Sequence, residues 1–217
     1  MSDFTSIGPL PSGARALVLT VSDGVAAGTR QDESGVALAD RLARAGFRVD
    51  RTAVADDRPL IERAFRDAAQ EHVFIISTGG TGLTPRDVTP QATLAVIDYE
   101  VPGLAEAMRA RGRAKTPMAD LSRGVVGVIG RALVVNVPGS PKAALESLAA
   151  LEPTLAHALE TLAGPFDHGS PAAGSQPLDT PSPSVGAEPA ADSADAPWTP
   201  MPDDNDEWRD LPERRQG

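Results

Sequence analysis

The sequence predicts an α/β fold with three layers, α/β/α, in which a mostly parallel sheet lies between helices and ends in a C-terminal antiparallel hairpin. Two observations carry this prediction. Short aliphatic runs alternate with segments of helical period between residues 14 and 164. Most of these runs end in a polar or glycine-rich turn, as strands of an open parallel sheet do. The chain has 217 residues, 41% of them hydrophobic, which is enough for one domain with a core.

The first two predicted strands lie near the N-terminus. Residues 14–21, ARALVLTV, form a near-continuous apolar run that predicts a central strand, followed by the polar turn Ser22, Asp23. The loop up to residue 34 is long, which fits either a binding loop or a plain connection. The alternating residues 47–54 predict a strand near a sheet edge.

Two helices are predicted around the second strand. Ser34 is the predicted N-cap of a helix that presents Leu38 and Leu42 on one face and stops at Gly46. The segment 59–70 predicts a further helix, with Leu60, Ala64, Phe65 and Ala68 spaced to face the sheet. A chain that alternates strand, helix, strand, helix and strand at these lengths forms right-handed parallel crossovers.

The segment 73–78, VFIIST, predicts a buried strand that leads into a glycine loop. Gly79, Gly80 and Gly82 remove three side chains there, so backbone N–H groups can approach an anion, and Thr81 adds a hydroxyl donor. A glycine loop by itself is weak evidence of binding, because most such loops are tight turns.

An acid and a helix start follow the glycine loop. Asp87 supplies a carboxylate, and Thr89 followed by Pro90 predicts an N-cap with proline at the first helical position. The order strand, glycine loop, acid and helix start places hydrogen-bond donors and a possible metal ligand at the carboxyl edge of the sheet, where open α/β sheets bind ligands.

The last third of the domain predicts a hairpin and a second anion-binding loop. Residues 125–129 and 132–137 are two strand-like runs joined by Gly130 and Arg131. They lead into Pro138, Gly139, Ser140, Pro141 and Lys142, and helices are predicted from Ser140 through Leu148 and over 151–162. Ser140 and Pro141 would leave free N–H groups at a helix start, and Lys142 would add a charge suited to phosphate, although a plain helix cap explains the first two equally well.

The polar groups at four strand ends are far apart in sequence, yet a parallel sheet brings strand ends to one edge. Two anion-binding loops with separate carboxylates suit a ligand with several phosphates and a bridging Mg²⁺, for which we select Asp56 and Asp87. The adjacent Asp57 remains an alternative to Asp56. The basic stretch 110–115 fits a solvated helix end, an anion site or a contact with another subunit.

Charge and composition exclude several classes. Residues 165–217 hold 11 of the 30 acids, only 3 of the 20 basic residues and ten of the twenty prolines, so the acidity belongs to a tail that we expect to be disordered. Trp198 and Trp208 in that tail fit a solvated extension or a short partner-binding motif.

Residues 1–13 are expected to form a flexible arm. Residues 14–164 have no basic excess, which argues against nucleic acid as a partner.

The chain has no cysteine, which excludes disulfides and thiolate catalysis. The sequence shows neither a signal peptide nor an apolar stretch of membrane-spanning length, so we expect a cytoplasmic protein without a membrane partner. The three histidines have no partner pattern that indicates a catalytic role, and we interpret each as structural.

Several segments together resemble the MogA/MoaB-type molybdopterin-binding family of molybdenum cofactor biosynthesis: LTVSDGVAAGTRQDESG, VADD, STGGTGLTPRDVTPQAT, YEVPG, LSRG and VPGSPKA. The resemblance covers about residues 14–164. It implies a Mg²⁺-dependent nucleotidyltransferase that transfers the adenylyl group of ATP to molybdopterin, releasing pyrophosphate. It also implies a homotrimer or hexamer, and a downstream enzyme that inserts molybdate.

Matched by motif, Asp56 and Asp87 are the expected catalytic and Mg²⁺-binding acids. A MoaB-like pterin-binding or regulatory scaffold with little or no catalysis is the alternative. The expected substrate-binding residues, from the strand ends and the matched motifs together, are Ser22, Asp23, Gly79, Gly80, Thr81, Gly82, Thr89, Ser122, Arg123, Pro138, Gly139, Ser140 and Lys142.

Overall fold

The structure, a computed structural model, describes residues 7–164. The predictions for the tail, including Trp198 and Trp208, lie outside the described residues. Residues 7–13 form no helix or strand, but Ile7 and Leu10 pack against the core, so this part of the predicted flexible arm is in contact with the domain.

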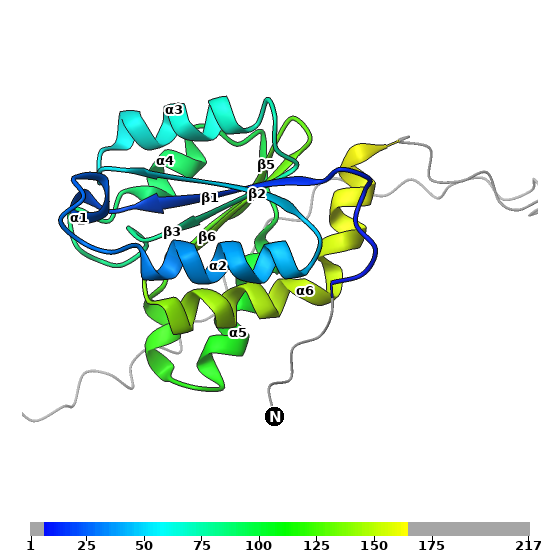
Figure 1. The fold of residues 1–217 in the computed structure, drawn as a ribbon. Helices are drawn as coiled ribbons and strands as arrows, with labels where there is room; N and C mark the ends of the chain where they lie inside the picture. The colour runs from blue at the N-terminus through cyan, green and yellow to red at the C-terminus, as the bar shows by residue number, and fades with distance from the viewer. Residues whose placement is uncertain (1–6, 165–217) are drawn as a thin grey trace, which may run out of the picture. The chain divides into compact units, whose positions relative to one another are not determined.

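A six-stranded sheet forms the centre of the domain, in the order β2-β1-β3-β6-β5-β4 (Figure 1). β1, β2, β3 and β6 are parallel, whereas β5 is antiparallel to both of its neighbours. The predicted hairpin and the edge position of the second strand are therefore confirmed, while β4 was not predicted. The strands are β1 (Arg15–Val21), β2 (Arg48–Val54), β3 (Phe74–Thr78), β4 (Tyr99–Glu100), β5 (Val126–Ile129) and β6 (Ala132–Val137).

Helices cover both faces of the sheet. On one face lie α2 (Glu33–Arg44), α5 (Pro102–Arg113) and α6 (Pro141–Ala163), and on the other lie α3 (Arg58–Ala68) and α4 (Thr89–Leu94) (Figure 1). Two short helices, α1 (Asp23–Ala26) and the 3₁₀ helix η1 (Pro117–Leu121), lie in connections. None of the helices in residues 7–164 is long and apolar enough to cross a bilayer.

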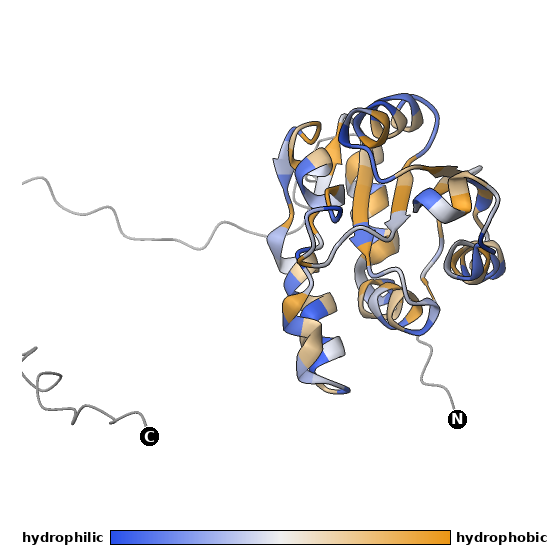
Figure 2. Cartoon of the chain, turned by 90° about the vertical axis from the view of Figure 1, so that its left-hand side faces the viewer, coloured by the Kyte–Doolittle hydropathy of each residue, from blue (hydrophilic) through white to orange (hydrophobic). Residues whose placement is uncertain are grey.

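Alternation along the central strands produces two cores. In β1, Ala16 and Val18 pack with α2 and α6, whereas Leu17 and Leu19 pack with α3 and α4. Figure 2 shows the apolar strands between helices whose outward faces are mainly hydrophilic. Because successive side chains of a strand point to opposite faces, a strand buried on both faces becomes continuously apolar. The predicted three-layer α/β/α fold is thus confirmed.

Two predicted helix starts were wrong in detail. Asp32, not Ser34, is the N-cap of α2 and accepts a hydrogen bond from the N–H of Gly35 at 2.9 Å, while Ser34 lies in the first turn. α3 begins at Arg58 and is capped by Asp57, whose carboxylate accepts from the N–H of Leu60 at 3.0 Å. Both aspartates satisfy N–H groups that the first helical turn leaves free.

The helix from Ser140 is also longer than predicted. Ser140 is its N-cap and Pro141 its first residue, as expected, but α6 continues without a break to Ala163 and contains Pro153. Proline removes one backbone hydrogen bond from a helix interior. The buried row of Leu148, Leu151, Leu155 and Leu159 continues past it and holds both halves of α6 against one core.

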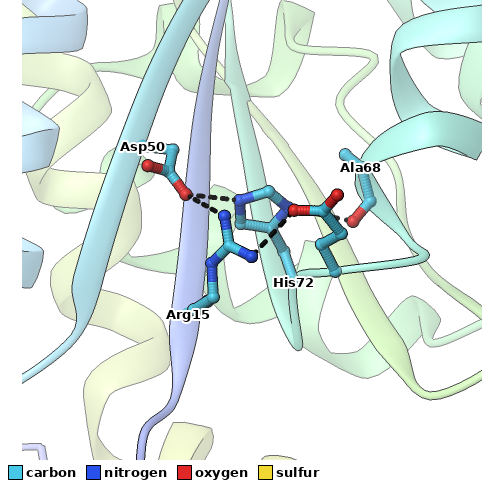
Figure 3. A network of polar contacts seen from close by, with 5 residues as sticks. Arg15, Asp50, Ala68 and His72 are labelled. Atoms are coloured by element: carbon cyan, nitrogen blue, oxygen red, sulfur yellow. Dashed lines mark hydrogen bonds and ion pairs between the residues drawn. The ribbon is translucent and has the colours of Figure 1, made fainter.

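A polar network lies at the start of β1 and β2 (Figure 3). Arg15 donates to Asp50 and to Glu71, both at 2.8 Å, and the ring of His72 contacts Asp50 at 2.9 Å and the carbonyl of Ala68 at 3.0 Å. The hydrogen bond from Arg15, and then that from His72, lowers the pKa of Asp50. His72 joins structural elements here, away from the carboxyl ends of these strands.

Candidate active site

A polar cavity of about 670 Å³ opens at the carboxyl ends of β1, β3 and β6. The predicted convergence of strand ends is present, because residues separated by more than a hundred positions line this one cavity. The predicted site residues that line it are Ser22, Asp56, Gly79, Gly80, Thr81, Gly82, Asp87, Pro138, Gly139 and Ser140.

The glycine loop packs too closely on its neighbours to carry side chains. Gly79 has a φ of +101°, and a Cβ there would lie 2.3 Å from the carbonyl oxygen of Val21 at the end of β1. Gly80 has a φ of +63°, and its Cβ would lie 2.3 Å from the hydroxyl of Thr89. Both positions therefore require glycine. Among the described residues the N–H groups of Gly80 and Thr81 have no hydrogen-bond acceptor, which leaves them available to an anion.

Thr89 supports this loop and does not line the cavity. The N-cap position of α4 is Val88, not Thr89 as predicted, and no side chain caps this helix. Thr89 is fully buried, and its hydroxyl instead donates to the carbonyl of Gly79 at 2.9 Å. A threonine at a helix start can cap the helix or bond to a neighbouring loop, and here the loop takes the bond.

Asn136 connects β6 to the elements beneath the glycine loop. Its side-chain amide donates to the hydroxyls of Ser77 and Thr93, both at 2.9 Å, and its oxygen accepts from the N–H of Val125 at 3.2 Å. Thr93 in turn donates to the carbonyl of Thr89 at 2.9 Å. Because all three of the amide's bonds are buried, Asn136 fixes α4, and with it Thr89, relative to the sheet.

The first acid, Asp56, is held by the turn after β1. Asp23 and Asp56 each accept a hydrogen bond from the other's backbone N–H, at 2.9 and 3.0 Å. The carboxylate of Asp23 also pairs with Arg86. Asp23 therefore positions Asp56 without lining the cavity itself. Because Asp57 caps α3, Asp56 is the residue of the pair that faces the cavity.

The second acid, Asp87, is held by its own loop. Its carboxylate accepts from the N–H of Thr84 at 2.8 Å and from the Thr84 hydroxyl at 2.6 Å. Burial raises the pKa of Asp87, but the hydrogen bonds from Thr84 and Gly82 and the charge of Arg123 leave it below its ordinary value. Arg123 donates to the carbonyls of Gly82 and Asp87 and so clamps the two ends of this segment.

Burial raises the pKa of Asp56, and the nearby charge of Asp87 raises it further. We expect a ¹³C NMR titration of the wild type to give Asp56 a pKa above the ordinary 3.8. In Asp87→Asn the pKa of Asp56 should be lower than in the wild type, because that variant removes the repelling charge. A folded-state pKa above the unfolded value means that ionisation of Asp56 costs stability as the pH rises through it. An Asp56 pKa identical in both proteins would show that the two carboxylates do not interact.

The acid pair fits a magnesium ion. Mg²⁺ takes oxygen ligands, commonly one or two carboxylates with the rest supplied by substrate phosphates and water. Residues 7–164 hold no cluster of three or more histidine, cysteine or acidic side chains placed to bind a metal. Asp56 and Asp87 share a cavity and repel each other, and a cation between substrate and protein would relieve that repulsion.

A second cavity, of about 300 Å³, adjoins the first and is mainly apolar. It lies among α5, η1 and α6 and shares Thr81, Gly82 and Pro138 with the polar cavity. Ser122 lines this second cavity, and its hydroxyl accepts from the N–H of Gly124 at 3.3 Å. The two cavities thus meet at the glycine loop.

Besides Asp23 and Thr89, two further predicted binding residues, Arg123 and Lys142, line neither cavity. Arg123 acts through the loop that it clamps, and Lys142 is exposed on the first turn of α6. Sequence reasoning also missed Arg30, which among the described residues is the sole Lys or Arg lining the polar cavity. Arg30 lies in the long loop before α2, and the length of that loop, which fits either a binding loop or a plain connection, was the signal that could have pointed to it.

The matches to known proteins identify the family. Residues 17–157 match the family described as "Probable molybdopterin binding domain". The chain is 42% identical over 161 residues to a molybdenum cofactor biosynthesis bifunctional protein of Synechococcus elongatus, covering 73% of this chain and 50% of that one. It is 34% identical over 154 residues to a molybdopterin adenylyltransferase of Helicobacter pylori, covering 69% and 88%.

Among solved structures, the fold is similar to that of the molybdopterin biosynthesis enzyme MoaB from Thermus thermophilus. The TM-score is 0.63 at 48% identity, covering 69% of this chain and 96% of that one. The chain spans about half the length of the first bifunctional relatives that it matches. Together with the glycine loop and the acid pair, these matches show that the chain belongs to the family of molybdopterin-binding domains of molybdenum cofactor biosynthesis.

Proposed function

We propose that this chain is a molybdopterin adenylyltransferase, which uses Mg-ATP to form adenylyl-molybdopterin and pyrophosphate. The observation that carries the proposal is the pair of adjoining cavities: one polar, with two carboxylates and a glycine loop, and one mainly apolar. The polar cavity suits a metal-bound triphosphate, and the apolar cavity suits a planar ring. The relatives named molybdopterin adenylyltransferase support this assignment.

In this proposal Asp56 and Asp87 hold Mg²⁺, which when bound would neutralise phosphate charge during the transfer. The N–H groups of Gly80 and Thr81 donate to a phosphate, and Arg30 adds the cavity's positive charge. A terminal phosphate oxygen of the pterin attacks the α-phosphorus of ATP, a new P–O bond forms, and the bond to the leaving pyrophosphate breaks. The nucleophile is already an anion, so no histidine or other protein base is needed.

The proposal extends to the surroundings of the reaction. We assign the activity to residues 14–164, and the family match over 17–157 supports this range. A homotrimer or hexamer in the cytoplasm, with a molybdate-inserting enzyme taking the product, follows from the resemblance of the motifs. Sedimentation of the purified chain tests the oligomeric part.

A MoaB-like scaffold that binds pterin without catalysis is the second candidate, because the motifs resemble MogA-type and MoaB-type proteins alike. Mixing the purified chain with molybdopterin, ATP and Mg²⁺ separates the two. We expect pyrophosphate release that depends on all three and is lost in Asp87→Asn. Pterin binding without pyrophosphate release would favour the scaffold.

A further inference from the structure

The apolar cavity contains a carboxylate that none of the interactions above uses. Ala143, Glu146 and Ser147 line it from α6, at a spacing that places them on one helix face. Glu146 is the only acidic residue among the described residues lining this cavity. Glu146 is partly buried, and its carboxylate makes no hydrogen bond or ion pair with any residue that the structure describes.

Arg109 is the one basic residue among the described residues lining this cavity, and it donates to the carbonyl of Gly124 at 3.3 Å. A partly buried carboxylate lacks part of its hydration and favours a ligand that brings N–H donors. A pterin carries such donors on its pyrimidine ring, where the 2-amino group and N3–H lie side by side. A carboxylate can accept both of them through its two oxygens. Adenine has no such adjacent pair on its pyrimidine ring, because N1 beside its 6-amino group is an acceptor.

The position of the apolar cavity beside the polar one agrees with binding of a pterin ring by Glu146. It shares Thr81, Gly82 and Pro138 with the polar cavity, so the phosphate of a ligand whose ring occupies the apolar cavity can enter the polar one. We propose that Glu146 is the specificity-determining residue that binds the 2-amino and N3–H edge of the pterin. This inference rests on the proposed function and deepens it.

Pterin and lumazine test the inference, because lumazine has a carbonyl in place of the 2-amino group and an N1–H in place of the N1 acceptor, so it lacks the adjacent donor pair of pterin. In the full-length wild-type chain, fluorescence titration should show pterin bound about tenfold or more tightly than lumazine, since a site built to bind an N–H group rejects an analogue that lacks it. In Glu146→Gln this preference should fall to about one, because an amide can donate to the lumazine carbonyl. Glu146→Asp should retain a preference for pterin.

Glu160→Gln is the matched control, because Glu160 is an exposed acid on the same helix and lies outside the cavity. It should leave the pterin preference intact. An unchanged preference in Glu146→Gln, or no binding of pterin by the wild type at millimolar concentration, overturns the inference. The pyrophosphate assay separates this inference from the proposed function. If the chain releases pyrophosphate but Glu146→Gln does not change the preference for pterin, only the inference is refuted. If the preference for pterin depends on Glu146 but no pyrophosphate is released, only the adenylyl transfer is refuted.

Discussion

Replacement of Asp56 by asparagine is expected to lower the rate of pyrophosphate release by about two to three orders of magnitude. The side chain lines the polar cavity and is kept in place by the paired hydrogen bonds with Asp23, so an amide should fit the same space. What the substitution removes is the negative charge that would hold Mg²⁺ and thereby the triphosphate. The rate should be measured with saturating ATP over a range of Mg²⁺ concentrations.

The adjacent residue supplies the control. Asp57→Asn makes the same chemical change one position away, at the N-cap of α3. Asparagine is as good an N-cap as aspartate, so this variant should keep both its stability and its activity. If both variants lose activity equally, then proximity to the cavity does not distinguish the two acids and the assignment of Asp56 is wrong.

Most of the fold and the acid pair could be predicted because they depend on local rules. A strand buried on both faces must be continuously apolar, and Arg15–Val21 and Phe74–Thr78 follow that rule. Parallel strands bring their carboxyl ends to one edge, so Asp56 and Asp87 could be placed together without knowing any distance. The resemblance of the motifs then pointed to the same two acids among the nineteen in residues 1–164.

The errors in the predicted helices arose where two nearby residues could both take the same role. Ser34 and Asp32 are both good caps two positions apart, and only the structure shows which one reaches the N–H of Gly35. Leu60 was expected to face the sheet with Phe65 and Ala68, but it is 43% exposed, because Ile61 takes that place on the buried face of α3. Successive residues of a helix lie about 100° apart, so Leu60 and Ile61 cannot both face the sheet.

The apolar cavity could not be predicted because no continuous segment encodes it. It forms where α5, η1 and α6 leave space between them, and its lining includes both small and large side chains from these helices. The spacing of Ala105 and Met108 fits a buried helix face but gives no sign of a hollow beside it. Such a space depends on how helices pack, which sequence periodicity does not specify.

The largest expected loss of stability comes from a buried ion pair between α2 and α6. Arg41 contacts Glu152 at 2.6 Å; the carboxylate side chain is 0% exposed and that of the arginine 18%. We expect Arg41→Ala to lower the free energy of unfolding by about 3 kcal/mol, because it leaves a buried charge without its partner. Urea unfolding of the full chain, followed by circular dichroism, measures the change.

Arg58→Ala is the matched control, since Arg58 contacts Glu62 at a similar 2.8 Å but is 52% exposed. Solvent screens that pair, and its loss should cost at most about 0.5 kcal/mol. The double variant Arg41→Leu with Glu152→Leu should recover most of the stability lost in Arg41→Ala, because it removes the isolated charge together with its partner. If Arg41→Ala costs no more than Arg58→Ala, burial does not strengthen the pair. α2 and α6, whose first turns both reach the polar cavity, would then be held together by their apolar contacts alone.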